Sequence, residues 1–210
     1  MIDLYLGPVG SGKSYHALKR GIDHVKNRNS FVVANFPIRP KNKKEEDRWI
    51  YMEDFEPKDL IRLSFERKSF GHEGRALLII DEAGIWFNSR DWQIDPQKRK
   101  EWIKFFSQTR KFGYDVILIV QDERMLDRQI RKLAEYHVKH IKLRNYKWMK
   151  LLPWQIFAAV RFWQGISFKG QVSFIFFNPF LAKRYDTMKL FKIDDELLQI
   201  AKENGIKVDK

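Results

Sequence analysis

The sequence contains no cysteine and no long uninterrupted apolar run, and each absence excludes a class of protein. Without cysteine there is no disulfide, no thiolate metal ligand and no cysteine nucleophile. Membrane-spanning helices require roughly 18 consecutive apolar residues. The longest candidates here, residues 151–163 and 172–181, are both interrupted by proline and by charged or polar residues. The first residues lack a basic segment ahead of an apolar one, so we expect no secretory signal.

The composition is that of a folded, basic protein of ordinary domain size. Its 210 residues are 44% hydrophobic and 15% aromatic, which is enough apolar material for a core and excludes a mainly disordered chain. Lysine and arginine number 40 against 27 aspartate and glutamate residues, giving a formal net charge of +13. This excess indicates an anionic partner, either nucleic acid or an anionic membrane surface.

Short apolar runs alternate with helical patterns along the first 150 residues. Strands are expected at residues 2–6, 31–34, 76–80, 116–120 and 138–146, and helices at residues 14–26, 57–67, 97–112 and 126–136. The charged stretch at residues 38–49 is expected to be a solvated loop. After residue 150, aromatic-rich segments at 154–163 and 171–177 indicate a hairpin. Apolar strands that alternate with helices predict an α/β fold with a parallel sheet covered on both faces.

A glycine-rich phosphate-binding motif follows the first expected strand. Residues 7–14 read Gly-Pro-Val-Gly-Ser-Gly-Lys-Ser and fit the pattern G-x-x-x-x-G-K-[ST]. Its glycines allow backbone amides to wrap phosphates at the positive end of a helix. Lys13 is expected to contact the β- and γ-phosphates, and the Ser14 hydroxyl to coordinate Mg²⁺. The predicted ATP-binding residues are Gly7, Pro8, Val9, Gly10, Ser11, Gly12, Lys13, Ser14 and Tyr15.

Two further polar positions follow apolar strands. Asp81 and Glu82 end the run at 76–80, where the aspartate is expected to hold Mg²⁺ and Glu82 to activate the attacking water. Gln121 ends the run at 116–120 and is expected to lie beside the first strand and sense the γ-phosphate. A solvated turn explains the acidic pair, and a satisfied strand-end amide explains the glutamine, without any catalytic role.

Other nucleotide enzymes fit this pattern less well. A GTPase reads guanine with N-K-x-D, and the nearest match, residues 42–45, ends in Glu45 and lies within the charged stretch. A small-molecule kinase of the same fold transfers phosphate to its substrate's hydroxyl and needs no base for water, so Glu82 favours a hydrolase. A nucleotide-dependent scaffold that does not hydrolyse ATP remains a third alternative.

Taken together, these motifs resemble the zonula occludens toxin family, which includes the filamentous-phage assembly ATPases and is related to the FtsK and HerA group of DNA-pumping motors. The resemblance extends over about residues 1–190 and is carried by residues 7–14, 77–83 with Trp86, 107–117 leading to Gln121, 126–131 and 184–187. The segments most typical of the family are 110–115 and Arg-Tyr-Asp-Thr at 184–187. The chain departs from the family pattern at Lys111, where a histidine is expected.

The resemblance implies a three-layer P-loop NTPase fold of the RecA/FtsK type, with a core at residues 1–150 and a β extension and tail at 151–210 packed on the same domain. It also implies an oligomeric ATPase, assembled as a ring, that uses ATP and Mg²⁺ to extrude or package single-stranded phage DNA. Family members carry a transmembrane helix after this domain. We therefore expect a cytoplasmic-face location, peripheral at the inner membrane, with the anchor outside the given chain or in a partner.

A ring ATPase completes each site with an arginine from the next subunit. Arg110, Arg128 and Arg131 are the candidates, although a helix-end cation explains Arg110 and a surface charge explains Arg131.

Two basic clusters are candidates for nucleic-acid contact. His140, Lys142, Arg144 and Tyr146 alternate along an expected strand, which predicts one cationic, aromatic-ended face toward solvent. Residues 98–100 form the second cluster. An anionic lipid surface is the alternative ligand, because the basic segment that ends at Lys150 continues into an apolar one. The five histidines lack the spacing of a zinc site, so Mg²⁺ is the only metal expected.

Overall fold

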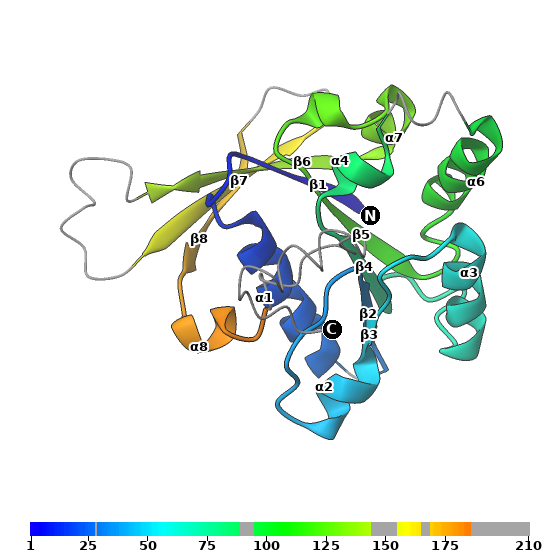
Figure 1. Cartoon of the computed structure of the whole chain (residues 1–210), viewed down its shortest axis with the longest axis horizontal. Coiled ribbons are helices and arrows are strands. Elements are labelled where there is room, and N and C mark those ends of the chain that lie inside the picture. Colours follow the sequence, from blue (N-terminus) through cyan, green and yellow to red (C-terminus); the bar gives the residue numbers. More distant parts are fainter. Residues whose placement is uncertain (28, 89–94, 144–154, 165–168, 186–210) are drawn as a thin grey trace, which may run out of the picture.

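The computed structural model describes residues 1–27, 29–88, 95–143, 155–164 and 169–185, which form a twisted sheet with helices on both faces (Figure 1). The strands are β1 (Ile2–Leu6), β2 (Phe31–Ala34), β3 (Trp49–Tyr51), β4 (Ala76–Ile80), β5 (Tyr114–Ile119), β6 (Tyr136–Lys142), β7 (Ile156–Trp163) and β8 (Lys169–Phe176). The helices are α1 (Lys13–Lys26), α2 (Lys43–Arg48), α3 (Pro57–Glu66), α4 (Ala83–Trp86), α6 (Pro96–Ser107), α7 (Arg128–Leu133) and α8 (Pro179–Ala182), with a short 3₁₀ helix, η1, at Glu123–Met125.

The strands form one sheet in the order β3-β2-β4-β5-β1-β6-β7-β8. The pairs from β3 to β6 are parallel, and β7 and β8 join antiparallel at one edge. This arrangement confirms the predicted α/β class and the predicted hairpin after residue 150. Because β1 lies between β5 and β6, the carboxyl ends of three neighbouring parallel strands meet where the phosphate-binding motif begins.

Two hydrophobic cores, one on each face of the sheet, hold the layers together. Leu18, Ile22 and Val25 of α1 are buried against one face. On the other face lie Leu60 of α3 and Trp102 of α6, together with side chains from α7. Burying a side chain of this size contributes roughly 1.5–3 kcal/mol, so both faces of the apolar central strands are stabilised by helices.

The charged stretch at residues 38–49 is not a loop, and this prediction was wrong. Residues 43–48 form α2, whose Asn42 cap accepts a hydrogen bond from the Glu45 backbone amide at 2.9 Å. Trp49 then starts β3, pairs with β2, and donates its indole N–H to the Phe36 carbonyl at 3.3 Å. Glu45 is 8% exposed and pairs with buried Arg184. Long-range contacts therefore give an ordered structure to a segment that local charge marked as solvated.

Two expected helices are shorter than predicted. α6 ends at Ser107 instead of residue 112, and the chain makes turns before β5. α7 covers only residues 128–133, because Asp127 caps its start and Tyr136 already pairs with β1. The predicted strand at 138–146 corresponds to β6, although residues 144–154 lie outside the described part of the chain.

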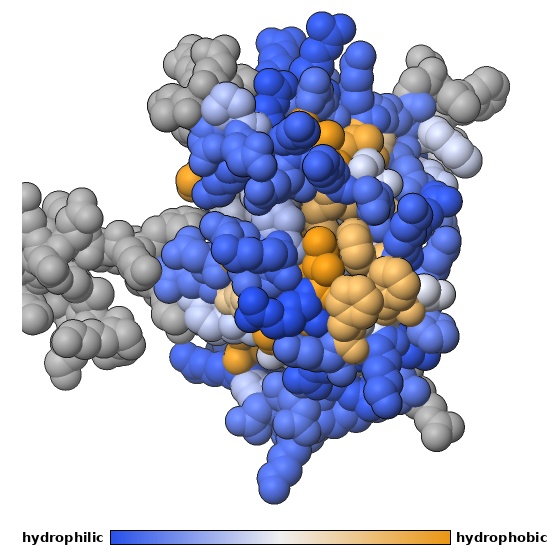
Figure 2. Space-filling model, turned by 90° about the vertical axis from the view of Figure 1, so that its right-hand side faces the viewer, coloured by the Kyte–Doolittle hydropathy of each residue, from blue (hydrophilic) through white to orange (hydrophobic). Residues whose placement is uncertain are grey.

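The face that carries α3 and α6 is mainly hydrophilic, with apolar side chains exposed in its middle (Figure 2). Its exposed aromatic residues include Phe65 and Phe70, whose stacked rings lie 4.9 Å apart. None of the helices in the described part of the chain is both long enough and apolar enough to cross a bilayer.

Candidate nucleotide-binding site

The glycine-rich turn connects β1 to α1 at the carboxyl edge of the sheet. Gly12 precedes α1 with a φ of 92°, a conformation that L side chains rarely adopt, and a Cβ at this position would lie 2.7 Å from the Phe157 ring. A Cβ on Gly7 would lie 2.7 Å from the His140 carbonyl oxygen. Only glycine fits these two positions, because β6 and β7 lie directly behind the turn.

Lys13 folds back over the turn that precedes it. Its Nζ donates hydrogen bonds to the carbonyls of Gly7 at 2.7 Å and Pro8 at 3.0 Å. Burial lowers the pKa of Lys13, and the charges of Asp81 and Glu82 oppose this shift. The charges of both carboxylates therefore act on the ammonium group.

Asp81 and Glu82 follow β4, which β5 separates from β1. The Asp81 Oδ1 accepts the Glu82 backbone N–H at 2.9 Å, and Glu82 adopts a left-handed conformation with a φ of 49° at the start of α4. Burial, followed by the charge of Asp81, raises the pKa of Glu82, while Lys13 acts in the opposite direction. Glu82 is consequently a stronger base than an exposed glutamate.

Asn35, just after β2, fixes the backbone of Asp81. Its amide nitrogen donates to the Asp81 carbonyl at 2.9 Å, and its amide oxygen accepts the Asp81 N–H at 2.8 Å. The sequence analysis missed this residue, because its role depends on β2 lying beside β4. An asparagine at the end of a predicted strand is the only local signal.

Tyr185 brings the end of the described chain into the same site. Its hydroxyl donates to the Asp81 Oδ2 at 2.8 Å, and the Ser14 side chain also interacts with it. Its ring packs edge-on against Phe36 at 4.7 Å. Burial, together with the nearby charge of Asp81, raises the pKa of Tyr185. The sequence placed Tyr185 in a family-typical segment without assigning it a role.

Behind the turn, His16 of α1 and His140 of β6 form a pair, with Nδ1 of His16 lying 2.9 Å from Nε2 of His140. Burial lowers the pKa of His16 to about 3, with a further contribution from His140. Burial also lowers the pKa of His140 to about 4. Both rings are therefore neutral at pH 7, and both pack against Tyr5 of β1.

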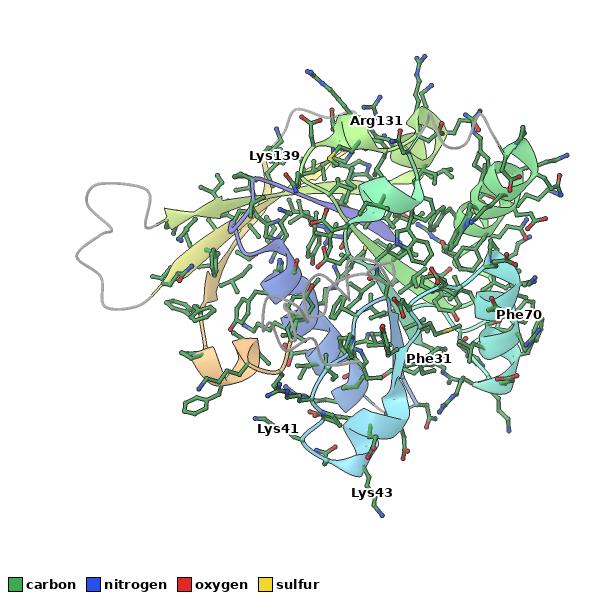
Figure 3. The ribbon with its side chains drawn as sticks, viewed as in Figure 1. Phe31, Lys41, Lys43, Phe70, Arg131 and Lys139 are labelled. Carbon is green, nitrogen blue, oxygen red and sulfur yellow. The ribbon has the colours of Figure 1, made fainter. Side chains whose placement is uncertain are left out.

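The remaining candidates for catalysis lie at different ends of the sheet. Gln121 is exposed just beyond β5, which pairs with β1, so it occupies the expected edge. Arg110 lies at the other end of the parallel strands, near their amino ends. There it pairs with Glu135 at 3.1 Å, and Glu135 also lies 3.7 Å from the amino terminus of the chain. Arg131 is on α7 (Figure 3) and donates to the Glu123 carbonyl at 3.5 Å. The structure thus places Gln121 at the site edge and Arg110 far from it.

The predicted cationic face of β6 is not on the solvent side at His140, which is 2% exposed and faces α1. The alternation is correct, but the exposed positions are Lys139 (Figure 3) and Ile141. Lys142 is half-buried, and Arg144 and Tyr146 lie outside the described residues. The error arose because charge was taken as a sign of exposure, whereas a neutral histidine is readily buried.

The second basic cluster is partly used within the fold. Arg99 pairs with the buried carboxylate of Asp127 at 3.0 Å, which ties α6 to the start of α7. Lys98 and Lys100 flank it on the same helix. Arg99 therefore has a structural role, and nucleic-acid contact by this cluster stays a prediction.

The oxygen atoms at the site match the preferences of a hard divalent cation. Ser14 and Asp81 offer a hydroxyl and a carboxylate that both interact with the Tyr185 hydroxyl, and Mg²⁺ favours such oxygen ligands. The buried Ser11 Oγ has no partner within the described chain. In that part of the chain no three His, Asp or Glu side chains form a metal-binding group of their own. These residues therefore fit a magnesium–nucleotide complex.

A glycine-rich turn between a central parallel strand and a helix, with an acidic pair at the end of a nearby strand, defines the P-loop NTPase class. In the sheet, β5 lies between the two strands that precede these motifs. Residues 1–151 match the family model described as Zonular occludens toxin (Zot). The chain belongs to the Zot family.

Similar proteins include phage proteins and solved NTPase structures. The chain is 26% identical to the Gene 1 protein of Enterobacteria phage I2-2 over 91% of its length and 57% of that protein's length. It is 38% identical to the Gene 1 protein of Enterobacteria phage f1, over 37% of this chain and 22% of that one. It thus spans less than two thirds of these curated relatives.

Two solved structures share the fold. The N-terminal domain of zonular occludens toxin from Neisseria meningitidis superposes with a TM-score of 0.55 and 17% identity, over 88% of this chain and 98% of that one. The genome packaging NTPase B204 from Sulfolobus turreted icosahedral virus 2, in complex with sulfate, gives a TM-score of 0.51 and 18% identity, over 82% and 94%. At these identities the likeness shows the fold.

Proposed function

We propose that this chain is the ATP-hydrolysing motor of a phage assembly or DNA-packaging machine. The backbone amides of the turn at residues 7–14 bind the phosphates, and Lys13 neutralises the β- and γ-phosphates. Ser14 and Asp81 hold Mg²⁺, which supplies charge neutralisation for phosphoryl transfer. Glu82 accepts the proton of the attacking water, and Gln121 senses the γ-phosphate from the neighbouring strand.

The observation that carries this proposal is that Lys13 and the acidic pair lie at the carboxyl ends of two parallel strands on either side of β5, where their charges interact. Residues 13 and 81 are far apart in the sequence, yet the charges of the acidic pair act on the pKa of the lysine. A triphosphate bound between them receives a cation on one side and a metal site on the other. The raised pKa of Glu82 makes it a better proton acceptor, and its position next to Asp81 keeps it beside the metal site.

The motor role is supported by family membership and by the names of the relatives. A structure with the same fold is described as a genome packaging NTPase, and the curated relatives are phage Gene 1 proteins. The net charge of +13 is suited to an anionic polymer. We therefore propose single-stranded phage DNA as the partner, with the protein working as a homo-oligomeric ring at the cytoplasmic face of the membrane, beside a membrane-anchored assembly partner.

In such a ring an arginine of one subunit completes the site of the next. Arg110 lies near the amino ends of the parallel strands, whereas its own nucleotide site lies at their carboxyl ends. Its side chain is 61% exposed, so it is available to a neighbouring subunit. Arg131 lies on α7 and is the second candidate. Domain organisation follows the same proposal, with a core at residues 1–150 and an extension at 151–210.

The test is ATP turnover measured with and without single-stranded DNA. Glu82→Gln should leave ATP binding within about twofold of the unaltered protein and lower turnover by roughly a hundredfold or more, the usual contribution of a general base. Lys13→Ala should lose binding. Glu66→Gln, at the exposed end of α3, is the matched control and should change neither.

Three outcomes distinguish the alternatives. Turnover that DNA stimulates supports the motor. Phosphate transfer to a small-molecule hydroxyl, with little hydrolysis, supports a kinase. Binding without any turnover supports a scaffold that changes shape with its nucleotide. Unaltered hydrolysis by Glu82→Gln would remove the assignment of the base.

A further inference from the structure

The last described segment of the chain crosses the candidate nucleotide site. It leaves β8, passes beside α1 and forms α8 (Figure 1), and we call residues 177–185 the C-terminal strap. At its start, the Asn178 backbone N–H donates to the Tyr15 hydroxyl at 2.8 Å, and that hydroxyl donates to the Phe176 carbonyl at 3.2 Å. Tyr15 follows Ser14 directly, so the strap begins at the helix that holds the phosphate-binding turn.

The end of the strap is fixed by a buried ion pair and by backbone pairing. Arg184 is 6% exposed, and its guanidinium pairs with Glu45 of α2. Its Nε donates to the Arg39 carbonyl at 3.0 Å, and the Arg39 N–H donates to the Arg184 carbonyl at 3.0 Å. Tyr185 forms an antiparallel bridge with Ile38. The position of the Tyr185 ring is therefore set from both neighbouring segments.

The Tyr185 hydroxyl connects the two side chains that are candidates to hold the metal. It donates its single proton to the Asp81 Oδ2 at 2.8 Å, and it also interacts with the Ser14 side chain. The other oxygen of Asp81 accepts the Glu82 backbone N–H. Each carboxylate oxygen of Asp81 thus has one fixed donor.

From this geometry we infer that Tyr185 is a positioning residue of the metal–nucleotide site, which holds the Asp81 carboxylate in the orientation that a magnesium–nucleotide complex requires. The inference rests on the proposed function. The strap residues are far from both motifs in sequence, yet their anchoring places one hydroxyl between them. A carboxylate with a fixed orientation binds its ligand without losing further rotational freedom, which is the advantage of preorganisation.

The experiment compares Tyr185→Phe with the unaltered protein and with Tyr136→Phe as the matched control. Tyr136 begins β6 and packs against Trp163, at the end of the strand remote from the turn. Binding of a fluorescent, non-hydrolysable ATP analogue is measured first in EDTA and then in a Mg²⁺ titration. Melting temperature is recorded for all three proteins.

We expect all three proteins to bind the analogue in EDTA within about twofold of one another. Tyr185→Phe should need about tenfold more Mg²⁺ for half-maximal enhancement of binding. A change of this size corresponds to the free energy of one hydrogen bond to a charged group. Tyr136→Phe should need no more than the unaltered protein. This readout is independent of turnover, so a purely structural role of Tyr185 does not produce it.

Two results would overturn the inference while leaving the proposed function standing. An unchanged Mg²⁺ requirement in Tyr185→Phe, even with a lower melting temperature, would show that the hydroxyl serves only the fold. A smaller Mg²⁺ requirement would show that the hydroxyl competes with the metal for Ser14 and Asp81. If the unaltered protein bound no nucleotide at all, the proposed function would fall and this inference with it.

Discussion

The buried pair of His16 and His140 predicts that acid destabilises this fold well before ordinary carboxylates are protonated. The rings are 2.9 Å apart between Nδ1 and Nε2, so one nitrogen must donate and the other accept. Charging either ring puts a cation into a buried site that already lies near Lys13 and Arg20. As the pH falls, the unfolded chain therefore binds more protons at these two histidines than the folded protein does.

The size of the effect follows from the two pKa values. In the folded protein they are lowered to about 3 for His16 and about 4 for His140, below the ordinary value of 6.5. Stability is present above pH 6.5 and is lost as the pH falls toward the folded values. With about 1.4 kcal/mol for each pH unit, lowering the pH from 7 to 5 should cost about 2 kcal/mol for each histidine and about 4 kcal/mol for the pair.

Urea unfolding at pH 7, 6 and 5 measures this loss directly. The double variant His16→Gln, His140→Gln keeps polar side chains at both positions and should lose most of the pH dependence, whatever its stability at pH 7. His72→Gln, at an exposed position, is the control and should keep the slope of the unaltered protein. If the double variant and the unaltered protein lost equal stability between pH 7 and pH 5, the histidine pair would not be the cause.

Two further predictions concern side chains that position Asp81. Arg184→Met leaves the buried Glu45 carboxylate unpaired and should lower the free energy of unfolding by about 3–5 kcal/mol. Adding Glu45→Met should recover most of that loss in urea unfolding, and failure to recover would contradict the ion-pair explanation. Asn35→Ala removes both amide hydrogen bonds to the Asp81 backbone and should cost roughly 1–3 kcal/mol. Thermal unfolding checks this value, and a neutral result would refute it.

The parts of the site that could be predicted are those determined by short, continuous stretches of sequence. The turn at residues 7–14 and the acidic pair at 81 and 82 each combine an apolar strand with a local motif, so local patterns suffice. The order of apolar strands and helices likewise predicted the α/β class. These features depend on neighbours in the chain, which is where sequence patterns carry information.

The parts that could not be predicted depend on contacts between distant segments. Asn35 forms hydrogen bonds with Asp81 because β2 and β4 are adjacent. Tyr185 contacts Asp81 because the ion pair between Arg184 and Glu45 anchors the neighbouring residue. The same ion pair explains why residues 43–48 form a helix instead of a loop. His140 was assigned to the wrong face because its partner, His16, lies on another element. Pairing and burial, and not composition, decide each of these cases.

The antiparallel extension supports the phosphate-binding turn as well as completing the sheet. Phe157 of β7 lies against Gly12, and the hairpin leads into the strap that contacts Tyr15 and ends at Asp81. A glycine-rich turn loses much conformational entropy when it orders around phosphate. Backing from β7 and anchoring of Tyr15 restrict the turn before any ligand binds. Part of the ordering cost is therefore met during folding, so the extension belongs energetically to the nucleotide site even though neither sequence motif lies within it.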